Sequence, residues 1–368
     1  MNSHPFRVRF APSPTGFPHV GNFRTALYNF LLARHYGGQF LLRIEDTDKE
    51  RSRPEYEEAI YESLRWMGLH WDEKPVHQSQ NLPRHQDEAR RLIGAGHAYR
   101  CRCPAERIDA LREQQMAAGL KPMYDGLCRD LNHPDDGTPF CVRLKSPDSG
   151  ATRISDRVRG DVTVSNGEVD DLVLLRTDGT PTFNFAVVVD DHDMGITHVI
   201  RGDDHLNNTI KQVLIYEALE YPIPQFAHLP QILGSDKTRL SKRHGATGVL
   251  EYRDQGYLAD AMINYIARLG WGHGDQEFFT REDLIRLFTI EEINKSAAVF
   301  DPQKLLWLNG EHIRAKSAGE VADLFADHMR RMQYLGDQTE AFFNDRRRVV
   351  KIVECTQVRA KTLDEIYQ

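Results

Sequence analysis

The chain has 368 residues, of which 40% are hydrophobic and 27% are charged, and this balance is typical of a globular protein with two or three domains. No stretch is apolar for long enough to cross a bilayer, and the N-terminus MNSHPFRVRF lacks the features of a secretory signal, so we expect neither a membrane protein nor a secreted one. The net charge of −7 argues against indiscriminate binding to polyanions, and five unevenly spread cysteines favour a reducing cytoplasm.

The N-terminal segment predicts a strand, a helix and a second strand. Residues 6–10 alternate apolar and basic side chains, and residues 39–44 form a nearly continuous apolar run. The helix between them is predicted to have Asn22 as its N-cap and to end at Gly37 and Gly38. A strand–helix–strand unit of this kind has parallel strands, and ligands bind beyond the carboxyl ends of such strands.

The sequence PHVGN marks the start of this helix. Unpaired N–H groups and the positive end of the helix dipole stabilise an anion there. Gly21 has no Cβ to keep an anion at a distance, and His19 can donate to a phosphate oxygen. The pattern predicts a nucleotide-phosphate site, although His-x-Gly is common by chance and an ordinary connecting loop is the alternative.

A second cationic segment follows a short strand predicted over residues 230–233. The loop GSDKTRLSKRHGA is bounded by glycines and rich in lysine and arginine. The compact charge of Lys242 would stabilise the negative charge that develops on a leaving pyrophosphate, on the order of several kcal/mol in a site with little water. A solvated basic loop is the alternative.

From residue 303 onward the chain has no proline and its pattern is helical. Ser317 and Glu320 form a capping box, which predicts a helix start. One face of this helix is predicted to consist of Val321, Leu324, Phe325, His328, Met329 and Met332. A further helix is predicted over residues 342–355, and its arginines 346–348 would either contact an RNA backbone or form a solvated face.

Several motifs occur together in one order: RFAPSPTGFPHVGN, LLRIEDTD, VVVDDHDMGITHVIRGDDHLNNT, RLSKRHGA and LGWGHGDQE. HVGN and RLSKR resemble the HIGH and KMSKS signatures of class I aminoacyl-tRNA synthetases, in which both segments hold ATP. The whole set, over about residues 5–310, resembles the bacterial-type glutamyl-tRNA synthetases. The resemblance implies that glutamate attacks ATP, with Mg²⁺, to give glutamyl-adenylate and pyrophosphate, and that the terminal ribose of tRNA then takes the glutamyl group. Positioning and charge stabilisation carry such chemistry, so no nucleophilic side chain is needed.

The resemblance also assigns roles to residues of this sequence. It places ATP at Thr15, His19, Gly21, Asn22, Ser241, Lys242 and Arg243, with His19, Gly21 and Lys242 as the catalytic group. It places L-glutamate at Arg9, Ala11, Ser13, Glu45, Phe183 and Arg201. Glutamate carries two carboxylates and one ammonium, so arginines suit the former and Glu45 the latter.

Two positions depart from the family pattern. Phe183 stands where tyrosine is common, and the missing hydroxyl would cost about 1 kcal/mol of glutamate affinity. Arg239 stands at the first basic position of the KMSKS-like loop, where lysine is common, while Lys242 is kept.

A cluster of cysteines lies within an insertion that the resemblance assigns to the tRNA acceptor end. Cys101, Cys103 and Cys128 suit zinc, because thiolates are preferred zinc ligands. Some relatives close such a site with a histidine where this chain has Asp130, so Asp130 is our predicted fourth ligand, and His133 and Tyr124 stay open as alternatives. Three reduced cysteines without a metal are the competing interpretation. The remaining two cysteines, at positions 141 and 355, are predicted to be buried thiols.

The predicted fold is α/β with four parts. Residues 1–80 and 186–240 form a Rossmann-like parallel-sheet catalytic domain, and residues 81–185 an inserted α+β acceptor-binding domain. Residues 241–315 form a stem-contact region that carries the lysine loop, and residues 316–368 begin an all-helical anticodon-binding region that looks cut short or naturally abbreviated.

The predicted enzyme is a monomeric, cytoplasmic glutamate–tRNA ligase that uses tRNA(Glu); whether it also charges tRNA(Gln) is left open. One alternative is the shorter paralogue that transfers glutamate to queuosine in tRNA, which lacks the helical C-terminal region. Another is a nucleotidyltransferase with a HIGH-type phosphate site, which would have neither the glutamate pocket nor the insertion.

Overall fold

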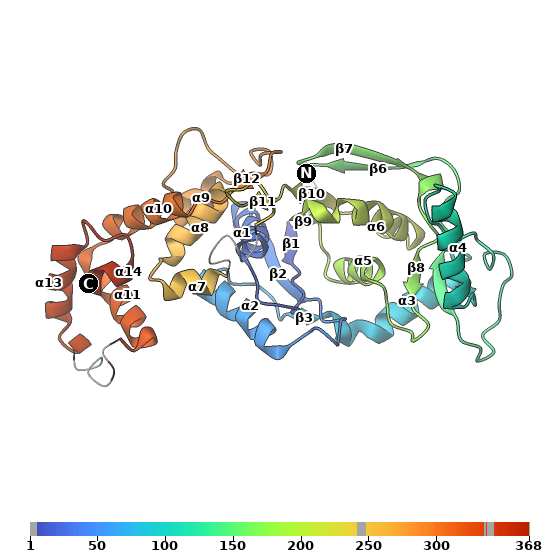
Figure 1. Ribbon diagram of the computed structural model, residues 1–368, viewed down its shortest axis with the longest axis horizontal. Coiled ribbons are helices and arrows are strands. Elements are labelled where there is room, and N and C mark those ends of the chain that lie inside the picture. Colours follow the sequence, from blue (N-terminus) through green and yellow to red (C-terminus); the bar gives the residue numbers. More distant parts are fainter. Residues whose placement is uncertain (1–5, 241–247, 335, 337–341, 368) are drawn as a thin grey trace. The chain divides into compact units, whose positions relative to one another are not determined.

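The computed structural model describes residues 6–240, 248–334, 336 and 342–367 (Figure 1). The chain divides into two compact units. Unit 1 comprises Met1–Arg9, Leu42–Thr47 and Lys74–His228, and unit 2 comprises Phe10–Leu41, Asp48–Glu73 and Leu229–Gln368. The predicted Ser241, Lys242 and Arg243 lie outside the described residues. The four-part domain division stays a prediction.

The strands β1 (Arg7–Phe10), β2 (Gln39–Ile44) and β10 (Gln225–Leu229) each have residues in both units. The other elements of unit 1 are β3 (Val76–His77), η1 (Gln78–Asn81), α3 (Leu82–Gly94), β4 (Ala98–Cys101), α4 (Ala105–Ala117), β5 (Cys141–Leu144), β6 (Ala151–Asp156), β7 (Gly160–Ser165), η2 (Asn166–Glu168), β8 (Val173–Leu175), α5 (Phe183–Asp193), β9 (His198–Gly202), η3 (Asp203–His205) and α6 (Leu206–Ala218). Those of unit 2 are α1 (Val20–His35), α2 (Pro54–Trp66), β11 (Ile232–Leu233), α7 (Val249–Asp254), α8 (Ala259–Arg268), α9 (Arg281–Leu287), β12 (Ala298–Val299), α10 (Pro302–Ala315), α11 (Ala318–Met332), α13 (Arg346–Thr356) and α14 (Leu363–Tyr367).

Three sheets organise the strands from β1 to β10. Their orders are β1-β2-β3, β7-β6-β10-β9 and β4-β5-β8. Parallel pairing joins β2 to β3 and β6 to β10, whereas β4, β5 and β8 pair antiparallel. The β6–β10 pairing sets Asp156 opposite Phe226, although 70 residues separate them in the chain. Side chains of β6, β9 and β10 are therefore brought together at one sheet.

The first predicted strand–helix–strand unit is confirmed as β1, α1 and β2. Gly37 has φ +61°, and the N–H of Gly38 donates to the carbonyl of Ala33 at 2.7 Å, so α1 ends as predicted. The predicted N-cap was wrong, because the cap is His19 and the helix begins at Val20. Histidine is not among the usual N-caps, so the sequence favoured the asparagine three residues later.

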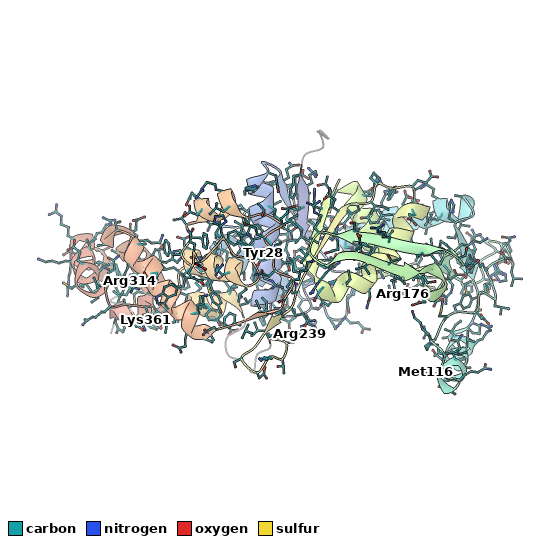
Figure 2. All side chains as sticks on the ribbon, turned by 90° about the horizontal axis from the view of Figure 1, so that it is seen from above. Tyr28, Met116, Arg176, Arg239, Arg314 and Lys361 are labelled. Carbon is teal, nitrogen blue, oxygen red and sulfur yellow. The ribbon has the colours of Figure 1, made fainter. Side chains whose placement is uncertain are left out.

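The core of unit 2 forms around α1, which buries most of its length. The Tyr28 ring packs edge-on against Phe288, with ring centres 4.7 Å apart, and its hydroxyl donates to the carbonyl of Ala267 at 2.9 Å. Arg314 of α10 and Lys361, which lies between α13 and α14, are side by side (Figure 2), both within 3.5 Å of where a Cβ on Gly310 would stand. A Cβ at Gly310 would therefore require the Arg314 guanidinium to move by a few tenths of an ångström, whereas its contact with Lys361 would be an ordinary one.

The C-terminal part is helical, as predicted. Ser317 caps α11 through the expected box with Glu320. The predicted apolar face is wrong at Leu324, which is 37% exposed, because Ala322 occupies the buried position instead. The helix predicted over residues 342–355 is shifted, since Asp345 caps α13 at Arg346. The α/β class with a helical C-terminal region is confirmed.

No helix among the described residues is both long enough and apolar enough to span a bilayer.

Candidate active site

The start of α1 is a capping box built from a histidine. The N–H of Gly21 donates to Nδ1 of His19 at 3.0 Å, and the N–H of His19 donates to Oδ1 of Asn22 at 3.0 Å. Because Nδ1 accepts a hydrogen bond, the ring proton of neutral His19 lies on Nε2. His19 as a whole lies at the surface of the chain.

Packing against the His19 ring requires a glycine at position 21, whether or not an anion binds there. A Cβ at this position would stand 2.8 Å from Cε1 and 3.0 Å from Nδ1 of His19. The ring therefore cannot cap the helix beside a residue with a side chain. Ala11, Ser13 and Thr15 precede this point on the loop, which is tied to the start of α2 by a 3.0 Å bond from the N–H of Arg53 to the carbonyl of Pro14.

Unit 2 also ties α1 to the segment that leads towards the lysine loop. Arg24 is 4% exposed and donates to the carbonyl of Leu269 at 3.0 Å and to the carbonyl of Pro230. Pro230 is the first residue of the strand predicted over residues 230–233, of which Ile232–Leu233 is observed as β11. The helix that carries the histidine motif and the strand that precedes the lysine loop thus share one buried arginine.

In unit 1 four charged side chains of alternating sign form a buried chain. Asp191 accepts from Nε of Arg9 at 2.9 Å and from Arg43 at 2.5 Å, and Arg43 donates to Glu45 at 3.0 Å. None of the four is more than 8% exposed. The outer members are the predicted Arg9 and Glu45, so the structure connects a cation and an anion that the sequence had linked only by motif.

Burial and pairing act on these carboxyl groups in opposite directions. Burial raises the pKa of Asp191, but Arg43 and Arg9 outweigh it, so the pKa lies below its ordinary value. Burial raises the pKa of Glu45 above its ordinary value and outweighs the opposing effects of Arg43 and Arg9. Sequence reasoning missed Arg43 and Asp191, whose only signal was a charged residue inside an apolar run.

Arg201 lies on β9 and is 6% exposed. Its Nη2 donates to Thr209 at 2.7 Å and to Gln212 at 2.6 Å, and its Nε donates to His228 at 3.3 Å. Among the described residues no carboxylate forms an ion pair with it. Burial, and then the repulsion of Arg9, lower the pKa of Arg201 to about 10, so it stays a cation at neutral pH.

Phe183 is the first residue of α5, and the next residue, Asn184, accepts from Gln212, a partner of Arg201. The ring centre of Phe183 lies 5.6 Å from that of His205, in a tilted arrangement. Burial, followed by the charge of Arg201, lowers the pKa of His205 to about 4, so this ring is neutral at pH 7. Phe183 and His205 together present a neutral aromatic wall.

The cysteine cluster is confirmed as a spatial group. The sulfurs of Cys101, Cys103 and Cys128 all lie within 4.8 Å of one another, and those of Cys103 and Cys128 are 3.6 Å apart. The hydroxyl of Tyr124 lies 3.5 Å from the sulfur of Cys101 and 3.3 Å from that of Cys103. The predicted Asp130 is not in the group, because its side chain is 89% exposed and lies 3.7 Å from Lys145.

His133 was the other alternative for the fourth zinc ligand, and Cys141 and Cys355 are the two cysteines outside the cluster. His133 offers only its carbonyl, to Arg100 at 3.3 Å, and its side chain is not part of the cysteine group. Cys141 pairs across the sheet with Cys101, and this contact lowers the pKa of Cys101 to about 4. Cys355 is exposed and Cys141 is only partly buried, so the prediction that both are buried thiols was wrong.

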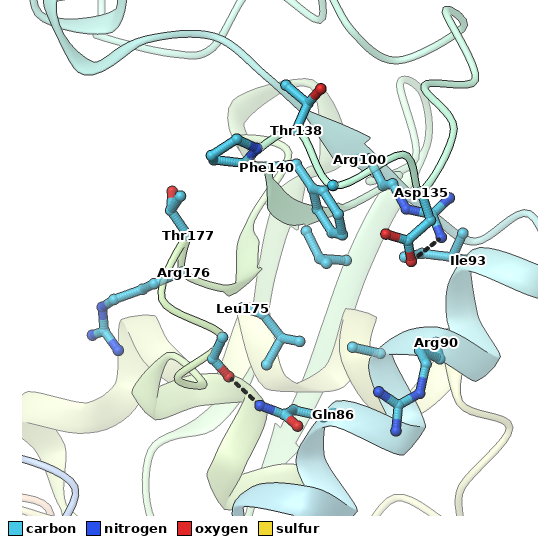
Figure 3. A pocket seen from close by; sticks show the side chains of 15 residues that line it. Gln86, Arg90, Ile93, Arg100, Asp135, Thr138, Phe140, Leu175, Arg176 and Thr177 are labelled. Atoms are coloured by element: carbon cyan, nitrogen blue, oxygen red, sulfur yellow. Dashed lines mark hydrogen bonds and ion pairs between the residues drawn. The ribbon is translucent and has the colours of Figure 1, made fainter.

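A pocket of about 350 Å³ opens in unit 1 between α3, β5 and the segments around residues 135–140 and 175–179 (Figure 3). Arg90, Arg100 and Arg176 face it together with a single acidic residue, Asp135. Arg100 pairs with Asp135 at 3.2 Å and lies 5.2 Å from the ring centre of Phe140. None of the predicted site residues lines this pocket.

Comparison with known proteins identifies a family. Residues 5–307 match the model of the catalytic domain of class I tRNA synthetases (E and Q). The chain is 56% identical over 324 residues to a glutamate–tRNA ligase of Geobacter sulfurreducens, covering 88% of this chain and 70% of that protein, and 51% identical over 361 residues to one of Citrifermentans bemidjiense, covering 98% and 76%.

Solved structures agree with these sequence relatives. A glutamate tRNA ligase of Elizabethkingia meningosepticum, crystallised in complex with its amino acid, superposes with a TM-score of 0.86 at 33% identity, over 99% of this chain and 79% of that one. The glutamate–tRNA synthetase of Elizabethkingia anophelis gives 0.85 at 33% identity, over 99% and 80%. The chain therefore belongs to the glutamate–tRNA ligase family of the class I tRNA synthetases.

Proposed function

We propose that this chain ligates L-glutamate to tRNA(Glu) with ATP and Mg²⁺, through glutamyl-adenylate. The observation that carries the proposal is Arg201, a buried cation whose hydrogen-bond partners are uncharged within the part of the chain that the structure describes. Burying a cation without a counter-charge costs several kcal/mol, and a substrate carboxylate would remove that cost. The relatives named above act on glutamate, which supports the same assignment.

The four buried charged side chains of unit 1 suit the remaining charged groups of glutamate. Arg9 offers a guanidinium that Asp191 already orients, and Glu45 offers a carboxylate that Arg43 orients. Glutamate has two carboxylates and one ammonium, so two arginines and one glutamate match its charges. Ala11 and Ser13 of the loop are proposed as further contacts, with Phe183 lining the site.

We propose that ATP lies at the start of α1. The exposed ring of His19 holds its N–H on Nε2, where it can donate to a phosphate oxygen. Gly21 and Asn22 lie in the first turn of α1, and Thr15 lies on the loop before it. Ser241, Lys242 and Arg243 are proposed to hold the other phosphates, with Lys242 stabilising the leaving pyrophosphate. Because the reaction proceeds by displacement at phosphorus, these groups act by positioning and by charge.

We propose a structural zinc at Cys101, Cys103 and Cys128. Sulfurs that share a tetrahedral zinc at about 2.3 Å lie roughly 3.8 Å apart, close to the 3.6 Å between Cys103 and Cys128. Tyr124, whose hydroxyl faces two of the sulfurs, is the better candidate for the fourth ligand than the exposed Asp130. When bound, zinc would cross-link β4 to the segment around residue 128.

Contact with the tRNA acceptor end is proposed for the segment 81–185. Its pocket presents three arginines and one aspartate around an aromatic ring, and such a surface favours phosphates and nucleobases.

ATP–pyrophosphate exchange tests the activity. We expect exchange with glutamate and an unmodified tRNA(Glu) transcript, and a loss of at least about a hundredfold in Lys242→Ala and in Arg201→Gln, since each removes a charge from a buried or water-poor site. Charging of the transcript with glutamate is measured beside exchange, because a transcript contains no queuosine and a glutamyl-queuosine enzyme would activate glutamate without charging it. Exchange with glutamine instead of glutamate, or none with either, would overturn the proposal.

Metal analysis tests the zinc site. We expect about one zinc per purified chain, and its loss in Cys101→Ser, with Cys355→Ser as a matched control on an exposed thiol. A wild-type chain that contains no zinc after expression in zinc-supplemented medium would contradict the assignment.

A further inference from the structure

Arg201 is surrounded by uncharged hydrogen-bond partners: Thr209, Gln212 and His228. Gln212 accepts from Arg201 through Oε1, and its Nε2 donates to Asn184 at 3.1 Å, which fixes the amide orientation. Thr209 accepts from Arg201 and lies 2.9 Å from Nε2 of His228. The guanidinium thereby has its Nε and Nη2 directions filled.

His228 connects this network to a buried carboxylate. Its Nδ1 lies 2.6 Å from Oδ2 of Asp156, and neither side chain is exposed. Asp156 can only accept in its ionised form, so Nδ1 carries the proton and Nε2 is left as an acceptor. Nε2 is the atom that receives Nε–H of Arg201, so the tautomer of His228 is dictated by a residue two contacts away from that arginine.

Burial favours the ionisation states that the geometry requires. Burial lowers the pKa of His228 despite the attraction of Asp156, which keeps the imidazole neutral. Burial raises the pKa of Asp156, but its bonds to His228 and to the N–H groups of Val158 and Arg159 outweigh it and keep the carboxylate ionised. A protonated His228 would turn its Nε2–H towards the donor of Arg201.

We propose that Asp156 and His228 are positioning residues that set the orientation of Arg201 while leaving its positive charge unneutralised, and that they thereby favour a substrate side chain ending in a carboxylate over one ending in an amide. This inference rests on the proposed function, in which Arg201 binds the amino acid.

The comparison with Arg9 within the same unit shows why an imidazole differs from a carboxylate here. Arg9 is held directly by Asp191 in an ion pair, so much of its charge is already compensated. Arg201 is held by neutral groups. The carboxylate of Asp156 bonds to His228 and not to Arg201, so the imidazole ring separates it from the guanidinium. The neutral partners therefore fix the orientation of the Arg201 guanidinium and leave its positive charge available to attract a substrate carboxylate.

The test compares His228→Phe with His228→Gln. Phenylalanine keeps a planar ring of similar volume but removes the acceptor for Arg201, whereas glutamine keeps a carbonyl oxygen that can accept. His328→Phe is the matched control, because His328 is also buried and paired with an aspartate, Asp364, but it lies in unit 2. Folding of each variant is checked by its thermal midpoint and circular dichroism.

In exchange assays with tRNA(Glu), we expect His228→Phe to raise KM for glutamate about tenfold or more, with KM for ATP unchanged. His228→Gln should recover part of this loss, and His328→Phe should leave KM for glutamate unchanged. A second readout is the affinity for adenosine sulfamoyl analogues that carry glutamate or glutamine. His228→Phe should lower the preference for the glutamate analogue at least fivefold, whereas damage to the fold alone would weaken both equally.

Other results overturn the inference. A folded His228→Phe with unchanged KM for glutamate, or with equal losses for glutamate and ATP, excludes a positioning role. If His228→Phe does not fold, Asp156→Asn provides the same test, because asparagine can present its amide hydrogens to Nδ1 and release the tautomer. A wild-type chain without glutamate-dependent exchange would refute the proposed function, whereas an active wild type with an unaffected variant refutes the positioning role alone.

Discussion

His19 and Gly21 depend on each other at the residue scale. The imidazole caps α1 only because the residue two places later has no side chain, so packing within the chain itself explains the glycine of this motif. The cap also fixes which ring nitrogen carries the proton. One contact thus sets both the start of the helix and the donor that would face a phosphate.

We predict that Gly21→Ala displaces the His19 ring, because the new Cβ would stand 2.8 Å from Cε1. The loss of the cap should lower the free energy of unfolding by about 1 kcal/mol. Pyrophosphate exchange should fall at least about tenfold, since the donor is no longer held in place. Gly16→Ala is the control, because nothing lies within 4 Å of its Cβ position. Equal activities of the two variants would contradict this account.

Phe183 offers a gain-of-affinity prediction. Phe183 is only partly buried, so Phe183→Tyr can add a hydroxyl without filling the core. We expect KM for glutamate to fall about fivefold, equivalent to about 1 kcal/mol for one added hydrogen bond. Phe185→Tyr on the same helix is the control: Phe185 is fully buried, so this hydroxyl should lower stability and leave KM unchanged. An unchanged KM in Phe183→Tyr would show that the family hydroxyl has no counterpart here.

At the scale of elements, α11 shows how end residues determine a helix. Ser317 accepts from the N–H of Glu320 at 3.3 Å, and Glu320 accepts from the N–H of Ser317 at 2.9 Å. At the other end Gln333 adopts φ +53°, a left-handed conformation that favours glycine. The N-terminal end of α11 therefore has a residue that favours its capping conformation, and the C-terminal end has one that does not.

The two ends of α11 should respond with opposite signs. Ser317→Ala should lower the free energy of unfolding by about 1 kcal/mol, because the N–H of Glu320 loses its acceptor, the serine hydroxyl oxygen. Gln333→Gly should raise it by up to about 1 kcal/mol, because glycine adopts the left-handed region without strain. Urea unfolding followed by circular dichroism measures both changes. A shift of the same sign in both variants would mean that the caps do not limit the stability of this region.

The sequence could predict elements whose signals are local. The strand at 39–44, the glycine end of α1 and the capping box of α11 each follow from a few adjacent residues. The start of α1 could not be found, because a histidine cap depends on the adjacent glycine. Motifs located Arg9, Glu45 and Arg201, but not the residues that support them. Asp156, Asp191 and His228 act through contacts between residues that are 27 to 182 positions apart in the chain.

At the scale of the whole molecule, buried histidines link stability to pH. Burial lowers the pKa of His198, His205 and His312 from 6.5 to about 4. In the unfolded chain each takes up a proton near pH 6.5, whereas the folded chain resists protonation until about pH 4. Below pH 6.5 the unfolded state thus binds more protons, so the stabilisation that is full above pH 6.5 is lost as the pH falls towards 4.

His312 provides the clearest test of this linkage, since it is 4% exposed and bonds to Asn264 at 3.0 Å. The difference between 6.5 and about 4 corresponds to roughly 3 kcal/mol for one group. In His312→Gln the amide can still donate to Asn264 but has no proton to take up, so the fall in thermal midpoint between pH 7 and pH 4.5 should be several degrees smaller than in the wild type. His70→Gln, at an exposed position, should follow the wild type. Parallel pH profiles for His312→Gln and the wild type would exclude His312 as a source of the acid sensitivity, because removal of the titrating ring would then have changed no proton uptake on unfolding.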